Sequence, residues 1–257
     1  MEDLDTSRVI PGCSDEMLRT LEAFGLHWDG EVEFQSRRIP LYTESINSLR
    51  VAGHTFECSC TRRDLSNTSE TGYLGTCRQG PTRPGVPTTT RFRVNDNEPV
   101  AWLDRIQGPC RIDPRELSDP VIRRRDGAFA YQLAVVVDDA AQKVTDVVRG
   151  ADLLQSTAWQ VQLQNALQLP TPRYGHLPLI LQSDGEKLSK SRGSLAIDPA
   201  HATAQLSEAL TLLQHIPPAE LQYSSTTELL AWAVVNWSLD LVQGRHEIVA
   251  SRPMSQV

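Results

Sequence analysis

At 257 residues the chain can bury a sizeable core, most simply as one large domain or one domain with inserts. Its 40% hydrophobic and 22% charged residues are typical of a folded globular protein. The net charge of −7 argues against a protein that coats nucleic acid indiscriminately, although the run Arg123, Arg124 and Arg125 could form a local basic patch.

The sequence gives no indication of a membrane segment or of a disulfide framework. No apolar run approaches the roughly 20 residues needed to cross a bilayer, and the start at Met1, Glu2 and Asp3 is acidic rather than basic. The five cysteines are an odd number in a long chain, which favours metal binding or plain burial of thiols. We expect a cytoplasmic protein, and a monomer.

The first 60 residues predict two helices and a short strand. Ser14 can cap a helix that carries Met17, Leu18, Leu21 and Phe24 and that Gly25 ends. Residues 38–51 show the apolar spacing of a second helix, and residues 55–58 that of a strand.

A region poor in aliphatic residues follows. Residues 64–87 are rich in Ser, Thr, Gly and Pro, so something other than an apolar core must hold them. Residues 89–94 and 100–106 alternate as strands of a small sheet, with residues 95–98 as the turn between them. This middle segment is interpreted as an insert.

Regular packing resumes after the insert. The valine-rich run at residues 129–137 favours an apolar strand, and a strand at 143–148, a helix at 151–169 and a strand at 177–181 follow. Strand, long helix and strand form a βαβ crossover, which implies a parallel sheet with ligands at the carboxyl ends of its strands. Helices are expected at 199–213 and 227–241, and a disordered tail from residue 251.

Two groups of residues suggest chemistry. The KLSKS segment at 187–191 places Lys187 and Lys190 on a loop where their ammonium groups can bind the triphosphate of ATP, although such a loop by itself is more often a solvated turn. Cys58, Cys60 and Cys77 can surround a tetrahedral zinc ion whose binding energy would replace the missing core.

The fourth position at this zinc site is open. His54 is the generic candidate for a ligand, Tyr73 is a rarer type, and water is a third possibility. The alternative interpretation of all three cysteines is that they are reduced structural thiols.

Five segments in order carry a resemblance to a known family. They are EDLD at 2–5, GLHWDG at 25–30, FAYQLAVVVDD at 129–139, VVRGADLL at 147–154 and KLSKS at 187–191. Together they resemble the catalytic domain of class I glutamyl-tRNA synthetases. The resemblance covers nearly all of residues 1–250 and is greatest to the short paralogues that have no anticodon-binding domain.

The resemblance implies a fold and its division. We expect an α/β fold with a Rossmann-like parallel sheet, formed by residues 1–53 and 121–197, with a zinc-binding insert at 54–120. A short C-terminal helical region at 198–250 and the tail at 251–257 complete the chain.

The resemblance also implies a reaction. ATP and L-glutamate would form an enzyme-bound glutamyl adenylate without tRNA, and the glutamyl group would pass to queuosine in the anticodon of tRNA(Asp). Glu2 would accept the ammonium of glutamate, Arg149 would pair with a carboxylate through its planar fork, and Tyr131 would add a hydroxyl hydrogen bond. Lys187 and Lys190 would be catalytic, with Lys190 binding ATP and Mg²⁺ sharing the phosphate charge.

For the metal, the family pattern is CxC followed by YxxxC. It implies one Zn²⁺ per chain held by Cys58, Cys60, Tyr73 and Cys77, and it nominates Tyr73 over His54. Cys13 and Cys110 lie outside the pattern and are interpreted as non-ligands.

The sequence departs from the family at its start. The family begins with an Arg-Phe-Ala-Pro-Ser-Pro-Ser-Gly type segment and a HIGH-type signature, and neither occurs here. Because Met1 stands where the family has an aliphatic residue or Met before Glu-Asp, we hypothesise that the functional product is longer. The alternative is an inactive remnant that acts at most as a zinc-containing tRNA-binding module.

Overall fold

The computed structural model describes residues 1–66, 73, 75–182, 185 and 197–250. The predicted tail from residue 251 lies outside these residues. Among the described helices, none is both long enough and apolar enough to span a membrane.

The two N-terminal helices form where the sequence predicts them. The first, α1, spans Cys13–Ala23 and starts at Gly12, which has a φ of 82°, so the prediction that Ser14 caps it is wrong. Helix α2 spans Ile39–Val51 after the 3-10 turn η1 at Gln35–Arg37. It buries Tyr42, Ile46 and Leu49, at the i, i+4, i+7 spacing of one helix face.

A three-stranded antiparallel sheet lies beside α2. Strands β1 (Thr55–Cys58), β2 (Thr89–Phe92) and β5 (Val121–Arg123) occur in the order β1-β2-β5. The short helix α3 (Arg62–Ser66) follows β1. This sheet carries the cysteine-rich part of the chain at the carboxyl end of β1.

A second, four-stranded sheet carries the candidate site. It contains β3 (Val100–Asp104), β4 (Gly108–Ile112), β6 (Asp146–Gly150) and β7 (Arg173–Leu177) in the order β4-β3-β7-β6. Pairing is antiparallel between β3 and β4 and parallel between β3 and β7 and between β7 and β6.

The predicted pairing of residues 89–94 with 100–106 is wrong. Strands β2 and β3 belong to different sheets, because β2 pairs with β1 and β5 whereas β3 pairs with β4 and β7. The intervening residues cross from one sheet to the other. Gln162 of helix α5 (Leu154–Leu167) accepts the backbone N–H of Asn95 at 2.7 Å and donates to its carbonyl at 3.0 Å. The η2 turn (Pro114–Glu116) leads from β4 back to the first sheet.

The valine-rich run is a helix, not the expected strand. Helix α4 spans Tyr131–Ala141 and buries residues on more than one side, namely Leu133, Ala134, Val136, Val137 and Asp138. A short apolar run of this kind fits a buried strand and a buried helix equally well. The buried Asp138 explains how the helix is fixed: its carboxylate accepts hydrogen bonds from Gln35, Arg38 and Tyr42.

The predicted βαβ crossover is confirmed. Strand β6, the η3 turn (Ala151–Leu153), helix α5 (Leu154–Leu167) and strand β7 follow one another, and β6 pairs with β7 in parallel. The second strand of the crossover is β7 at Arg173–Leu177, earlier than the predicted residues 177–181, because Pro178 has no N–H to continue the ladder beyond Leu177. After it, β8 (Leu179–Leu181) pairs in parallel with β9 (Glu247–Val249).

The C-terminal region is helical, as predicted, but more interrupted. It contains η5 (Pro199–His201), α6 (Ala202–Leu212), η6 (Ala219–Tyr223), α7 (Thr226–Asn236) and η7 (Leu239–Leu241). Ser225 and Glu228 form a capping box at the start of α7. Leu210 of α6 and Leu229 and Ala233 of α7 form the small core between the two helices.

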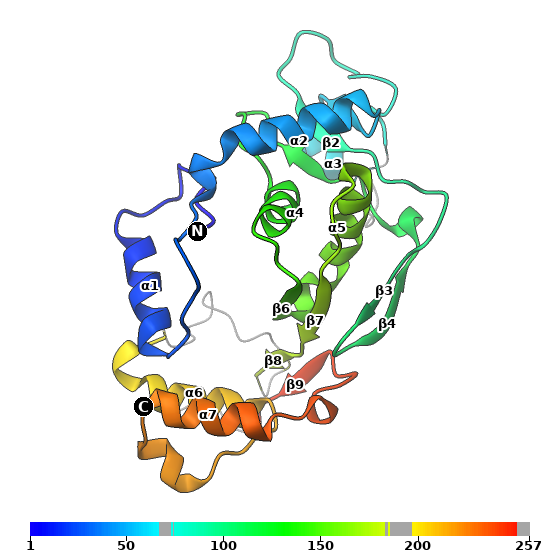
Figure 1. Cartoon of the computed structure of the whole chain (residues 1–257). Coiled ribbons are helices and arrows are strands. Elements are labelled where there is room, and N and C mark those ends of the chain that lie inside the picture. Colours follow the sequence, from blue (N-terminus) through cyan, green and yellow to red (C-terminus); the bar gives the residue numbers. More distant parts are fainter. Residues whose placement is uncertain (67–72, 74, 183–184, 186–196, 251–257) are drawn as a thin grey trace.

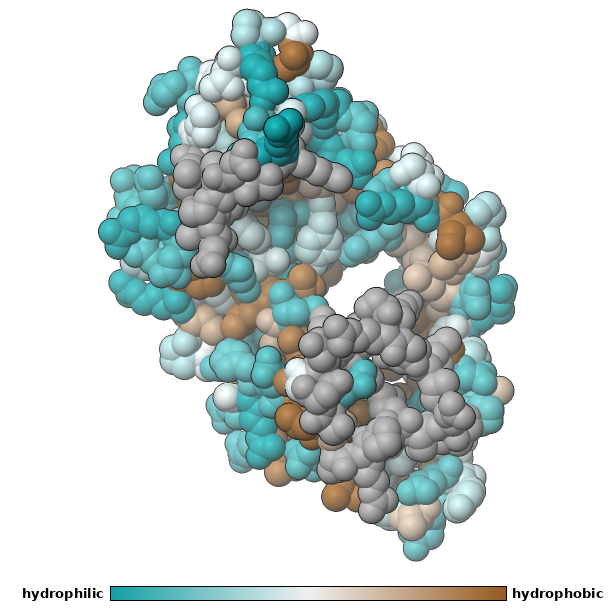
Figure 2. Space-filling model, turned by 180° about the vertical axis from the view of Figure 1, so that it is seen from behind, coloured by the Kyte–Doolittle hydropathy of each residue, from teal (hydrophilic) through white to brown (hydrophobic). Residues whose placement is uncertain are grey.

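The elements surround a central opening. In Figure 1 α1, α4, strands β6 to β9 and the pair α6 and α7 lie around it, and the space-filling view in Figure 2 shows it as a gap. The largest apolar core lies on one side, where α2, α4 and α5 pack together around Tyr42, Leu133 and Leu163. The carboxyl ends of β6 and β7 lead toward the opening (Figure 1).

We expect Asp138→Ala to destabilise the fold by about 3 kcal/mol, because it leaves a mostly buried guanidinium and a buried phenol without their shared acceptor. Urea denaturation followed by circular dichroism measures this difference. The matched control is Asp96→Ala, which removes an exposed carboxylate paired with Arg78 at 3.4 Å and should cost less than about 1 kcal/mol. Equal effects of the two substitutions would contradict this assignment.

Candidate active site

Arg149 lies at the centre of a polar network between β6, β7 and α5. Its Nε donates to His176 Nε2 at 3.0 Å, and its Nη2 donates to Thr157 Oγ1 and Gln160 Oε1 at 2.8 Å each. The guanidinium also lies over the Tyr174 ring, 5.3 Å from its centroid. These contacts fix the plane and the direction of the guanidinium.

Tyr131 meets the remaining edge of this guanidinium. The Nη1 of Arg149 donates to the Tyr131 hydroxyl at 3.4 Å, which brings together two residues 18 positions apart in the sequence. The second N–H of Nη1 has no acceptor among the residues that the structure describes, and neither does the Tyr131 O–H proton. These two donors are therefore available to an anionic group.

Asp104 and His176 support the other side of the network. The carboxylate of Asp104 is fully buried and accepts backbone N–H groups from Ile106, Gln107 and His176 at 2.9–3.0 Å. Its second oxygen lies 2.5 Å from His176 Nδ1. Burial acts to raise the pKa of Asp104, but the N–H of Gln107 and the imidazole of His176 outweigh it and lower the pKa. The carboxyl is thus held ionised.

A second acidic group lies near Arg149. Asp139 is partly buried at the end of α4, and it lines a cavity of about 350 Å³ together with Glu2, Trp28 and Gln142. Burial raises its pKa to about 6, and the charges of Asp138 and Glu2 act in the same direction, while Arg149 opposes them. Glu2, Asp139 and Arg149 are therefore within electrostatic reach of one another.

The sequence interpretation gave Asp139 no role, although it lies in one of the segments that carry the family resemblance. The signal that could have found it is the pair of adjacent carboxylates at 138–139 after a valine-rich run. Both line the cavity, but their environments differ: Asp138 accepts hydrogen bonds from Arg38 and Tyr42, whereas the carboxylate of Asp139 accepts none from the residues that the structure describes. A carboxyl group with a raised pKa in a cavity is a frequent feature of functional sites.

The two catalytic lysines predicted from the KLSKS segment, Lys187 and Lys190, lie outside the described residues. Strand β8 ends at Leu181, shortly before this segment.

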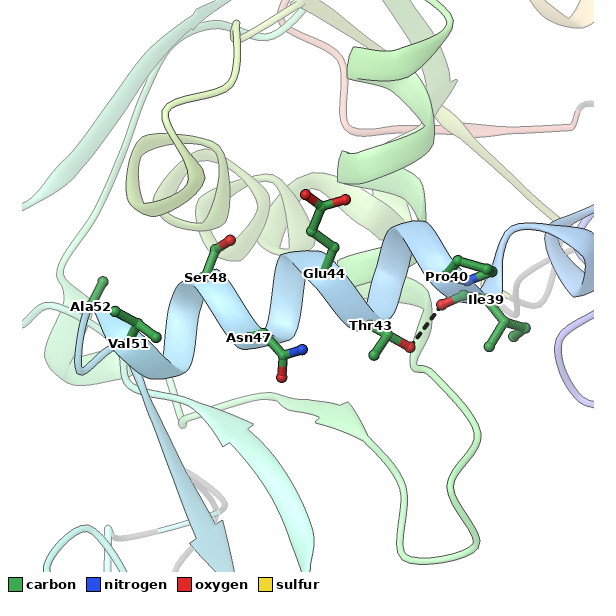
Figure 3. A pocket seen from close by; sticks show the side chains of 8 residues that line it. All are labelled: Ile39, Pro40, Thr43, Glu44, Asn47, Ser48, Val51 and Ala52. Carbon is green, nitrogen blue, oxygen red and sulfur yellow. Dashed lines mark hydrogen bonds between the residues drawn. The ribbon is translucent and has the colours of Figure 1, made fainter.

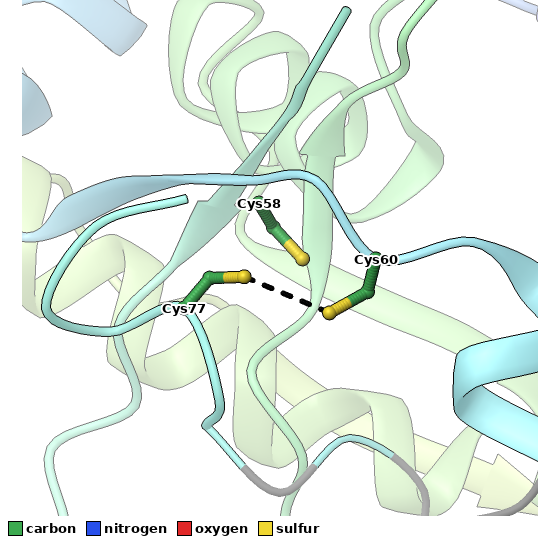
Figure 4. Close-up of side chains that lie close together, drawn as sticks. All are labelled: Cys58, Cys60 and Cys77. Atoms are coloured by element: carbon green, nitrogen blue, oxygen red, sulfur yellow. Dashed lines mark hydrogen bonds between the residues drawn. The ribbon is translucent and has the colours of Figure 1, made fainter. Parts of the chain in front are cut away.

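The predicted cysteine cluster is confirmed. Cys58 comes from the end of β1, Cys60 from the segment after it and Cys77 from a turn, and Figure 4 shows their sulfur atoms pointing toward one another. The three sulfur atoms all lie within 4.8 Å of one another, and those of Cys60 and Cys77 are 3.6 Å apart. Two thiolates bound to one zinc ion at about 2.3 Å are separated by about 3.8 Å, so the residues fit this metal.

Tyr73 lies beside these thiols. Its side chain is buried, its hydroxyl accepts the backbone N–H of Cys77 at 2.6 Å, and Arg91 covers its ring at 4.0 Å. Burial and a hydrogen bond with Cys58 raise the pKa of the phenol. His54, the other candidate, packs against Phe92 and does not join the described thiols.

The other cysteines agree with the sequence interpretation. Cys13 and Cys110 lie outside the cluster, and all five cysteines are free thiols.

The side chains of the arginine run at 123–125 contact other residues of the chain. Arg123 covers the Phe129 ring, Arg124 pairs with Asp5 at 2.8 Å, and Arg125 donates to the carbonyl of Cys60 at 3.3 Å. These contacts explain the run structurally.

A broad hollow of about 880 Å³ runs along α2 and is not the candidate site. Figure 3 shows its lining, which comes from one face of a single helix and includes Ile39, Pro40 and Val51. Glu44 is its one charged side chain, and no residue predicted to bind substrate lines it. The convergence of several elements on Arg149 is a more specific arrangement.

Comparison with known proteins shows the family of the chain. Residues 1–231 match the family model described as tRNA synthetases class I (E and Q), catalytic domain. The chain is 49% identical over 248 residues to the Glutamyl-Q tRNA(Asp) synthetase of Chromobacterium violaceum, covering 94% of this chain and 82% of that protein. It is 47% identical to the protein of the same name from Pseudomonas aeruginosa, covering 92% and 80%.

Solved structures show the same fold. The crystal structure of glutamate-tRNA synthetase from Elizabethkingia anophelis superposes with a TM-score of 0.77 at 23% identity and covers 97% of this chain. A glutamate tRNA ligase from Elizabethkingia meningosepticum gives 0.74 at 22% identity. The chain spans about three fifths of the length of each of these two proteins.

The match over residues 1–231 shows that the chain is a class I aminoacyl-tRNA synthetase catalytic domain, and its parallel β6-α5-β7 unit agrees with that class. More narrowly, the chain belongs to the glutamyl and glutaminyl branch of the class I tRNA synthetases, a family of ligases.

The raised pKa of Asp139 determines how the stability of the fold changes with pH. The folded chain binds a proton at this group up to about pH 6, whereas the unfolded chain releases it near pH 4, so stability falls as the pH rises through this range. We expect Asp139→Asn to increase the free energy of unfolding at pH 7.5 by about 1 kcal/mol, given the partial exposure of the group. This gain should disappear near pH 4.

Thermal unfolding at pH 7.5 and pH 4 measures this gain. Asp138→Asn is the matched control, because the adjacent carboxylate accepts hydrogen bonds and its replacement should destabilise the chain at pH 7.5. A loss of stability in Asp139→Asn at pH 7.5 would show that the carboxyl is not strained by burial.

Proposed function

We propose that the chain activates glutamate with ATP, forming an enzyme-bound glutamyl adenylate without tRNA, and transfers glutamate to queuosine in the anticodon of tRNA(Asp). The observation that carries this proposal is the Arg149 network, with two donors that have no acceptor among the described residues, in a chain 44–49% identical to proteins named Glutamyl-Q tRNA(Asp) synthetase. The reaction would take place in the cytoplasm, with the chain acting as a monomer.

The hydrogen bonds of Arg149 support a particular mode of carboxylate binding. Its Nε and Nη2 already donate to His176, Thr157 and Gln160, so that edge of the planar fork is occupied by the protein. A carboxylate of glutamate would instead accept one bond from Nη1 and one from the Tyr131 hydroxyl. Charge-assisted bonds of this kind are short and directional, which suits selection of an acidic amino acid.

The ammonium group of glutamate requires a negative partner. Glu2 lines the same cavity as Asp139, and the carboxylates affect one another electrostatically. We assign the ammonium to Glu2, with Asp139 adding negative potential. A bound ammonium would lower the pKa of Asp139, because an opposite charge favours the ionised carboxyl.

The phosphate chemistry is assigned from the sequence. Lys187 and Lys190 would bind the triphosphate of ATP, and Lys190 would stabilise the charge on the leaving pyrophosphate, with Mg²⁺ sharing that charge.

We also propose that one Zn²⁺ is held by Cys58, Cys60, Tyr73 and Cys77. The three converging thiols and the adjacent phenol support this ligand set. The apolar core around them is small, consisting of Phe56, Tyr73, Cys58 and Cys77 with Cys60 and Leu65 packed against it. The metal would therefore hold this segment together.

Glutamate-dependent exchange of pyrophosphate into ATP, measured without tRNA, tests the first step. We expect exchange, and about a tenfold rise in the KM for glutamate in Tyr131→Phe with little change in the KM for ATP, because one hydrogen bond to the carboxylate is lost. Arg173→Lys on the neighbouring strand β7 is the matched control: its side chain is 61% exposed and pairs with Asp146 outside the site.

The outcomes of the exchange experiment separate two functions. Exchange only in the presence of tRNA would favour a glutamyl-tRNA synthetase fragment. No exchange by this chain or by a version extended upstream would favour a non-catalytic zinc-containing tRNA-binding module. Transfer is tested by charging tRNA(Asp) with and without queuosine, and only the queuosine-containing tRNA should accept glutamate.

Metal analysis of the purified chain tests the zinc assignment. We expect about one zinc per chain, a loss of most of it in Cys77→Ser, and full retention in the control Cys110→Ser, whose thiol lies outside the cluster. Chelation should lower the melting temperature of the parent chain but not that of Cys77→Ser. Equal zinc contents in the two variants would refute the assignment.

A further inference from the structure

We propose that Asp104 and His176 are positioning residues that aim Arg149 at glutamate by fixing the tautomer of the imidazole. This inference rests on the proposed function, because it concerns the same substrate. It goes beyond that function in assigning the orientation of the arginine to a buried carboxylate on β3, a strand outside the βαβ unit.

Asp104 is held as a carboxylate by the groups around it. One of its oxygens accepts three backbone N–H groups, from Ile106, Gln107 and His176. Its other oxygen lies 2.5 Å from His176 Nδ1 and needs a donor there, because the carboxylate is ionised in a site without solvent contact. The proton of the imidazole therefore lies on Nδ1.

The other ring nitrogen of His176, Nε2, is the acceptor for Arg149. With the proton on Nδ1 of a neutral imidazole, Nε2 has a free lone pair and accepts the Nε–H of Arg149 at 3.0 Å. Burial lowers the pKa of His176, which agrees with a neutral ring. Thr157 Oγ1 lies 3.1 Å from the same Nε2 and can donate its proton there, whereas the opposite tautomer would direct a ring N–H at the Nε–H of Arg149, which is a repulsive contact.

The pairing of β6 with β7 sets the direction of the guanidinium. Arg149 and His176 are direct partners in the parallel register of β6 and β7, so the imidazole lies beside the base of the guanidinium. With Nε held by His176 and Nη2 held by α5, Nη1 is the nitrogen left to face Tyr131 and the substrate. Loss of the contact at Nε would let the guanidinium rotate away from this direction.

We call the contacts from Asp104 through His176 to Arg149 the relay. Asp104→Asn tests the relay with little change in the shape of the side chain. The Asn oxygen can still accept the three backbone N–H groups, but its NH₂ would face Nδ1 and stabilise the Nε2–H tautomer. We expect a rise of about tenfold or more in the KM for glutamate, with the KM for ATP within about twofold of the parent value. The exchange reaction without tRNA measures both constants.

Two substitutions of His176 form a matched pair. His176→Asn can keep an N–H toward Asp104 but has no atom at the place of Nε2, so the KM for glutamate should rise as in Asp104→Asn. His176→Gln can place an amide oxygen near that position and accept from Arg149, so its KM for glutamate should stay closer to the parent value than that of His176→Asn. A purely structural role for the histidine would not distinguish Asn from Gln in this way.

Nuclear magnetic resonance of ¹⁵N-histidine-labelled protein gives a readout that needs no substrate. The spectrum should show the Nδ1–H tautomer for His176 in the parent chain and the Nε2–H tautomer in Asp104→Asn, with His176→Gln identifying the signals. An Nε2–H tautomer in the parent chain would overturn the relay.

The relay would also be overturned if a folded Asp104→Asn variant had the Nε2–H tautomer of His176 and still had the same KM for glutamate as the parent chain. Absence of exchange both in the parent chain and in a version extended upstream would instead count against the proposed function. The tautomer measurement then decides by itself whether Asp104 sets the proton position on His176.

Discussion

The hydrogen bonds around the guanidinium of Arg149 join β6, β7, α5 and α4 at the candidate site. A half-buried cation must find acceptors inside the protein, because leaving its N–H groups unpaired away from water costs several kcal/mol. Side-chain acceptors come from three elements: His176 on β7, Thr157 and Gln160 on α5, and Tyr131 on α4. The parallel register that places Arg149 opposite His176 is therefore strongly specified, since a slip of one residue would turn the imidazole to the other face.

Local pattern accounts for the parts of the fold that sequence reasoning predicted correctly. The spacing of Tyr42, Ile46 and Leu49 predicts α2, and the strand, helix and strand at 143–181 predict the crossover. The run at 129–137 was misassigned because a buried helix and a buried strand both present apolar residues on most sides. The hairpin at 89–106 was misassigned because alternation identifies strands but does not identify their partners.

In the candidate site too, local motifs identified some residues, whereas residues that depend on tertiary contacts were missed. Arg149, Tyr131 and the three cysteines were nominated from motifs, and the structure places Arg149 beside Tyr131 and the cysteines beside one another. Asp104 could not be nominated in this way. Its importance arises from a contact with His176, 72 residues later, that exists only because β3 pairs with β7. Asp139 was missed because its raised pKa results from burial, which depends on packing.

The dual attachment of the segment between β1 and β5 limits how this chain can be divided. At one end the segment carries the thiol cluster, and at the other it contributes β3 and Asp104 to the sheet of the candidate active site. Arg78, next to Cys77, also forms a two-pronged ion pair with Asp119 near the end of the segment. The segment therefore lacks the independence of a detachable module, and exchanging it between relatives would replace part of the catalytic sheet. A chimera that respects the architecture has its junctions within the segment, between β2 and β3, so that Asp104 stays with its native histidine.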